Sequence, residues 1–183
     1  VCAQEDRNDQ NDGGYSPSQS NGHFEYTFTN AYMNSGGTDV DTDLDAAITN
    51  LFYMINYIHD YYYGLGFDDV AGNFQRENVS GFGLGNDEVQ ADVQDGWDTG
   101  QRNNANFYTL PDGGKPRMQM YLFNNPRNAD GDFDGDVIIH VYTHGLSTRL
   151  VGGPSNIGTL SGIQSGAMGE GWGDWFASSI YND

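Results

Sequence analysis

The 183-residue sequence is poor in cysteine, in basic residues and in long apolar runs. Cys2 is its single cysteine, so no disulfide bond can form within the chain. Seven lysines and arginines stand against 26 acidic residues, which gives a formal net charge of −19. Because so few cations can neutralise phosphates, we expect no nucleic-acid partner. No apolar run approaches the roughly 20 residues that span a membrane, so we expect no membrane partner either.

The composition is nevertheless that of a folded protein. Hydrophobic residues make up 37% of the chain and aromatic residues 14%, which argues against disorder for most of its length. The length suits one domain. We expect residues 1–22, rich in Asn, Asp, Gln and Ser, to form a mobile polar segment, and residues 23–183 to form the domain. With Val1 in place of an initiator methionine and no signal peptide, we expect a processed or excised piece.

Hydrophobic periodicity predicts both helices and strands. Apolar residues recur every three or four positions over 43–63, between a potential helix start at Asp43 and a potential stop at Gly64. Further helices are predicted over 137–150 and from about 165 to 180. Alternating patterns predict strands over 23–28, 88–93, 106–109 and 117–123. This mixture indicates an α+β fold.

Two histidines at helical spacing form a candidate metal site. His140 and His144 are four residues apart, so both imidazoles project from one helix face and can bind one zinc ion. Glu170, on the next predicted helix, would complete a His₂Glu set, and Asp174 one turn later could orient a ligating histidine. The alternative is that both acids are solvated. Glycines at 169, 171 and 173 weigh against it, because glycine in a helix is unfavourable unless another group comes close.

These residues lie in segments that resemble the fungalysins, secreted fungal zinc metallo-endopeptidases related in architecture to thermolysin. The segment 140–150, followed by Gly152-Gly153-Pro154, resembles their zinc helix, and 165–175 resembles their third-ligand helix. The likeness continues upstream through Asn50-Leu51-Phe52-Tyr53, Ala71-Gly72-Asn73-Phe74, the stretch 103–107 and the stretch 116–122.

The resemblance implies a thermolysin-like N-terminal lobe, with a mixed or antiparallel sheet, a long helix, the zinc helix and the third-ligand helix. It further implies a secreted, extracellular protein with zinc as cofactor and an extended peptide or protein as substrate. In the family, an edge strand aligns the peptide by main-chain hydrogen bonds. The residues in this chain that match that strand are Asn104, Ala105 and Asn106.

The chain departs from the family at the catalytic position and in length. The family motif is H-E-x-x-H, whose glutamate acts as the general base, but Val141 stands there and has no titratable group. We also expect the family's C-terminal helical lobe to be absent. Both departures predict a chain that binds zinc but is close to inert as a protease. Three explanations stay open: a fragment of an enzyme, a natural non-catalytic derivative, or an engineered or misread Val141.

Two further sites are suggested by short motifs. Asp130, Asp132 and Asp134 match the first half of an EF-hand loop, and Asp136 resembles a calcium-ligand position of thermolysin-like enzymes. Position twelve of that loop, which should be glutamate, falls on Val141, so a plain acidic turn is the alternative to calcium. Asn78 begins the sequon Asn-Val-Ser, a candidate glycosylation site.

A second reading is a non-catalytic binding protein built on the same fold. It would bind carbohydrate or peptide through an aromatic surface, for which the candidates are Tyr61, Tyr62, Tyr63, Trp97 and Tyr108. These residues can equally be structural. Saturable ligand binding that survives a chelator, or that needs the metal without any cleavage, would favour the binding protein.

Overall fold

The computed structural model describes residues 1–11 and 13–181 and has the expected α+β architecture. Its main sheet has the strand order β1–β2–β4–β3. Strands β1 (Cys2–Glu5), β2 (Gln90–Val93) and β4 (Arg117–Met120) are parallel, and β3 (Ala105–Tyr108) is antiparallel to β4. Strand β3 is therefore an edge strand. Strands β5 (Leu122–Phe123) and β6 (Ala129–Asp130) form a separate two-stranded ladder.

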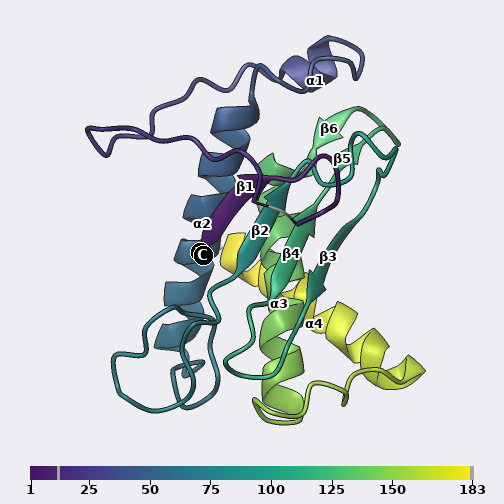
Figure 1. Ribbon diagram of the computed structural model, residues 1–183. Coiled ribbons are helices and arrows are strands. Elements are labelled where there is room, and N and C mark those ends of the chain that lie inside the picture. The colour runs from purple at the N-terminus through teal and green to yellow at the C-terminus, as the bar shows by residue number, and fades with distance from the viewer. Residues whose placement is uncertain (12, 182–183) are drawn as a thin grey trace.

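Three long helices complete the fold (Figure 1). They are α2 (Leu44–Gly64), α3 (Gly135–Val151) and α4 (Ile163–Tyr181), and each confirms a predicted helix to within about two residues. The short α1 (Ala31–Asn34) and the 3₁₀ turn η1 (Gly131–Phe133) precede α2 and α3. Helices α2 and α3 pack against each other and against the sheet, and α4 packs along α3.

The core lies between the sheet and α2 and α3. The periodic face of α2 supplies Leu51, Ile55 and Ile58, all fully buried, and β4 contributes Met118 and Met120 from the opposite side. Burying a side chain of this size stabilises the fold by about 1.5–3 kcal/mol relative to exposure. The same core extends onto α3, so the helix that carries the two histidines is held by hydrophobic packing on its inner face.

The structure corrects two sequence-based expectations. The predicted strand over 23–28 is wrong, because this stretch forms no strand and leaves Phe24 and Phe28 45% and 50% exposed. Conversely, Cys2–Glu5, inside the segment expected to be mobile, form strand β1 with Ala3 and Gln4 buried. The stretch 23–28 has no strand to pair with, whereas β1 pairs with β2. The domain boundary at residue 22 stays a prediction.

Candidate metal centre

The two histidines and the glutamate converge on one point. His140 Nε2 lies 3.0 Å from His144 Nε2 and 3.1 Å from Glu170 Oε2. His144 Nε2 lies 3.4 Å from the same glutamate oxygen. Ligands that bind zinc tetrahedrally at about 2.0–2.1 Å stand about 3.3 Å from each other. The three distances match that spacing, so these residues fit a zinc ion with a fourth position left for water.

Asp174 lies beside the first histidine. Its Oδ1 lies 2.9 Å from His140 Nδ1, so a proton on Nδ1 can be donated to the carboxylate. Nε2 of His140 then keeps its lone pair and faces the other two ligands. Burial lowers the pKa of His144, which favours the neutral imidazole that a metal requires.

Gly173 allows α4 to approach the first histidine. A Cβ at this position would lie 2.8–2.9 Å from Nδ1, Cε1 and Cγ of the His140 ring, which is closer than atoms can pack. The neighbouring glycines differ: a Cβ at Gly169 would make only an ordinary contact with Leu160, and one at Gly171 would meet nothing within 4 Å. The expectation that all three glycines admit a close neighbour therefore holds for Gly173 alone.

Both ends of α3 are fixed. At its start the side chain of Asp134 accepts a hydrogen bond from the backbone N–H of Val137 at 3.3 Å. At its end the fully buried Arg149 donates to Leu110 O at 2.7 Å and pairs with Asp87 at 3.2 Å. Sequence reasoning missed Arg149, although an arginine in the last turn of a helix with apolar neighbours was a signal for it.

Val141 lies beside the ligands. It is 2% exposed and belongs to the core, but it also lines a pocket of about 630 Å³ together with His140 and Asp174. Asn104 and Ala105 line the same pocket from the edge of the sheet. The structure therefore brings Val141 and two of the three predicted substrate residues to one cavity.

The third predicted substrate residue points elsewhere. Successive strand residues face opposite sides of a sheet. Accordingly, the side chain of Asn106 donates to the hydroxyl of Tyr121 at 3.3 Å and does not line the pocket. Its main chain remains on the edge strand β3.

Three side chains of the acidic loop before α3 are buried or engaged within the protein or at the start of α3, and calcium binding there stays a prediction. Asp130 accepts the backbone N–H of Asp132 at 3.0 Å, Asp134 caps α3, and Asp136 lies on the exposed first turn. Asp132 is fully buried, and burial raises the pKa of its carboxyl well above the ordinary value. Across residues 1–11 and 13–181, the groups of three or more side chains that could hold a metal do not include this loop.

Both polar atoms of the Asn78 side chain form hydrogen bonds within the protein. Asn78 Nδ2 donates to Phe82 O at 2.7 Å, and Asn78 Oδ1 accepts from Gln75 Nε2 at 3.2 Å. In this conformation the amide nitrogen that would carry a glycan is turned toward the protein's own loop. Glycosylation at Asn78 stays a prediction.

The five aromatic residues proposed for a binding surface do not form one. Tyr62 is 1% exposed, Tyr61 packs against the core, and Trp97 stacks with the guanidinium of Arg102 at 3.4 Å. The two exposed members, Tyr63 and Tyr108, lie on different elements, α2 and β3. The structural interpretation of these residues fits this arrangement better.

Comparison with known proteins agrees with the ligand geometry. All of the chain, residues 1–183, matches the family described as fungalysin metallopeptidase (M36). The chain belongs to the fungalysin metallopeptidase family. Metallopeptidases of this family require a metal, so the His₂Glu site has the chemistry that membership implies.

Similar fungal proteins extend well beyond this fungalysin sequence. It is 48% identical to "Extracellular metalloproteinase 5" of Arthroderma otae and 50% identical to "Extracellular metalloproteinase MEP" of Fusarium vanettenii. Each alignment covers 91% of this chain but 25% of the relative, so the chain spans about a quarter of their length. Within the part that the structure describes, we find no helix with the length and apolarity of a membrane span.

Proposed function

We propose that this chain is the zinc-binding part of a secreted, extracellular fungalysin-type protein that holds peptides without cleaving them. One observation carries the proposal: three ligand atoms converge within 3.4 Å of each other, directly beside a buried valine. The ligand set is that of a catalytic zinc, and the adjacent side chain lacks the carboxylate that catalysis needs.

When bound, zinc would polarise a carbonyl and activate water as a Lewis acid. His140, His144 and Glu170 would hold it, with Asp174 fixing the ring of His140. Val141 can neither accept a proton nor return one to a leaving amine. Because general acid–base catalysis contributes about 10²–10⁴-fold, hydrolysis should fall by at least that factor.

An extended peptide fits the free side of β3. This strand pairs with β4 on one side only, so the backbone groups on its other side are available for an added strand. The pocket formed by Asn104, Ala105 and Val141 lies between that edge and His140, where a side chain of the peptide would sit.

Zinc titration of the metal-stripped protein tests the metal site. We expect one equivalent to bind by calorimetry, and His144→Ala to weaken binding at least about a hundredfold because one of three ligands is lost. His59→Ala is the matched control, since His59 also lies on a helix but contacts Asp60 and Gln75. Absence of saturable binding, or equal weakening by the control, would refute the metal site.

Val141→Glu tests the missing general base. In the natural protein that contains this sequence, we expect little cleavage of a quenched fluorescent peptide. The variant should raise kcat/KM by at least about a hundredfold while zinc affinity stays the same. If the unaltered protein already cleaves as fast as the variant, the proposed loss of hydrolysis is wrong, although zinc binding would stand.

A further inference from the structure

Two carboxylates stand at the rim of the pocket beside the proposed metal site. The pocket has a volume of about 630 Å³, and its acidic lining residues are the exposed Asp136 on α3 and Asp174 on α4. His140, which also lines it, is neutral when it binds a metal. Among the residues that the structure describes, no lysine or arginine lines this pocket. A cationic group that enters it therefore meets carboxylates without a competing cation.

The carboxylate of Asp136 has no partner within the described part of the chain. It lies in the exposed first turn of α3, one turn before His140, and takes part in no ion pair within 4 Å among residues 1–11 and 13–181. Arg127 lines a neighbouring hollow together with Asp136, but the two side chains do not pair. The negative charge of Asp136 therefore remains for a ligand.

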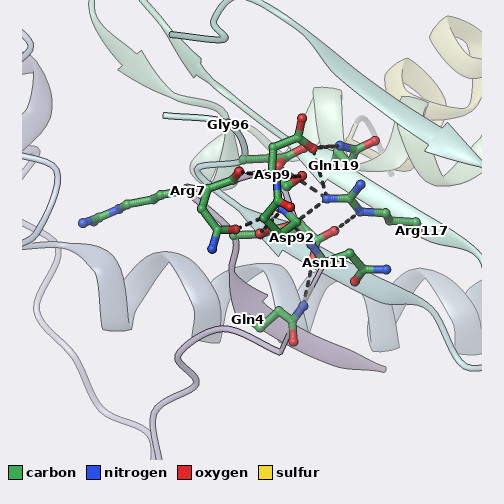
Figure 2. A network of polar contacts seen from close by, with 12 residues as sticks. Gln4, Arg7, Asp9, Asn11, Asp92, Gly96, Arg117 and Gln119 are labelled. Carbon is green, nitrogen blue, oxygen red and sulfur yellow. Dashed lines mark hydrogen bonds and ion pairs between the residues drawn. The ribbon is translucent and has the colours of Figure 1, made fainter. Parts of the chain in front are cut away.

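Basic side chains elsewhere have partners of their own. Arg102 adjoins Asn103 of the pocket wall, but its guanidinium stacks on the ring of Trp97 at 3.4 Å. Arg7 and Arg117 belong to a separate network of polar contacts at the ends of β1 and β2 (Figure 2). None of these three cations neutralises the pocket.

The deeper walls of the pocket are apolar. Val137 and Val141 line it from α3, Ala177 from α4 and Phe123 from β5. Val141 and Ala177 are only 2% and 4% exposed, whereas the carboxylates lie at the surface. Long basic side chains suit such a pocket, because their methylene stem packs on apolar surface while the charged head stays near water. An acidic side chain would meet repulsion at the same rim.

We propose that this pocket selects a lysine or arginine side chain of the bound peptide, and that Asp136 determines the preference. The inference rests on the proposed function, since a peptide added to β3 brings its side chains to Asn104 and Ala105, which line the same pocket. Asp174 adds negative charge, but its Oδ1 already lies 2.9 Å from His140 Nδ1. Asp136 is therefore the partner for the charged head.

Zinc in the adjacent site does not reverse this preference. The ion carries +2 and an ionised Glu170 carries −1, so a centre with two neutral histidines carries +1. Asp136 and Asp174 together contribute −2, which leaves −1 around the pocket. The whole chain carries −19 and attracts any cationic peptide over its surface. An experiment therefore has to separate the charge of the pocket from that of the whole chain.

Peptide binding to the zinc-loaded natural protein that contains this sequence tests the inference. Fluorescent alanine-based peptides carry lysine, norleucine or glutamate at one position, which is moved along the peptide in turn, and anisotropy gives each Kd. At one position we expect lysine to bind about two- to fivefold tighter than norleucine, which has a similar length without the charge, and glutamate to bind weaker than both. Raising the salt from about 0.1 M to 1 M should shrink the preference, because the screening length falls from about 10 Å to about 3 Å.

Two aspartate variants separate the local charge from the overall charge. Asp136→Asn should remove the preference for lysine over norleucine. Asp45→Asn is the matched control and should keep it, because Asp45 also lies in the first turn of a helix and its loss changes the net charge equally, but it does not line the pocket.

Three results would overturn the inference while peptide binding stands. They are equal affinity for lysine and norleucine at every position, a preference that salt does not change, and a preference that Asp45→Asn reduces as much as Asp136→Asn does. If no peptide of the set binds, the proposed function fails and this inference fails with it.

Discussion

Replacing Gly173 by alanine should damage the metal site through a single methyl group. The added Cβ would stand 2.8 Å from Nδ1 of His140, whereas ordinary contacts begin near about 3.5 Å. Either the ring or α4 must therefore move by about 0.7 Å. Metal–ligand distances tolerate about 0.2 Å, so the three donors can no longer meet one zinc ion in good geometry. We expect zinc affinity to fall at least about tenfold.

The stability of the same variant reflects two opposing effects. Alanine is better than glycine inside a helix by about 0.8–1 kcal/mol, but overpacking costs about 1–3 kcal/mol. Gly171→Ala is the matched control, because its Cβ would meet nothing within 4 Å and it gains the helix propensity alone. Urea unfolding should therefore rank Gly171→Ala above the unaltered protein and Gly173→Ala below the control by about 1–3 kcal/mol.

Zinc competition against a coloured chelator, run beside the urea titrations, measures the first effect. Gly171→Ala should bind zinc as the unaltered protein does. The reasoning is refuted if Gly173→Ala matches Gly171→Ala in both zinc affinity and stability, because the two methyl groups would then be equivalent. A loss of stability without a loss of zinc affinity would show that α4 shifts and the ring of His140 does not.

Two further changes test the supports of α3. Arg149→Met should lower the free energy of unfolding by about 3–5 kcal/mol, since it leaves the buried Asp87 without its cation; a loss below about 1 kcal/mol in urea would contradict this. Asp132→Asn should gain stability relative to the unaltered protein as pH rises from acid to neutral. Burial raises the pKa of the Asp132 carboxyl, so folding favours its protonated form. The stability that this form contributes is complete below the pKa of Asp132 in the unfolded chain and is lost as pH rises through its pKa in the folded protein. A stability difference between variant and unaltered protein that stays constant with pH would count against this.

Helices were predictable because their determinants are local. The three- and four-residue spacing in α2 and the capping residue Asp134 act within one helix, so the sequence alone locates them. Strands depend on partners far away in the chain. Cys2–Glu5 have no alternation that marks a strand and become one because β2, almost 90 residues later, is free to pair. The alternating stretch 23–28 has no such partner, and there the same reasoning failed.

The candidate metal site was likewise predictable from the sequence only in part. Helical spacing places His140 and His144 on one face, and the glycine-flanked Glu170 on the next predicted helix was joined to them by its residue type before the family likeness added support. The importance of Gly173 depends on how closely two helices approach, which no local pattern encodes. The same packing brings together the two carboxylates at the rim of the pocket beside the metal site, so their shared position was missed entirely.

The unequal support of the two helices has a consequence for metal binding. Helix α3 is capped at one end and anchored by a buried arginine at the other, whereas α4 has α3 as its principal neighbour. The two histidines on α3 are thus preorganised, whereas Glu170 lies on α4, which is held along one side. The entropic cost of assembling the proposed site would fall mainly on α4, and a bound zinc ion would link the two helices. Slowing of amide exchange along α4 on metal addition would measure that coupling directly.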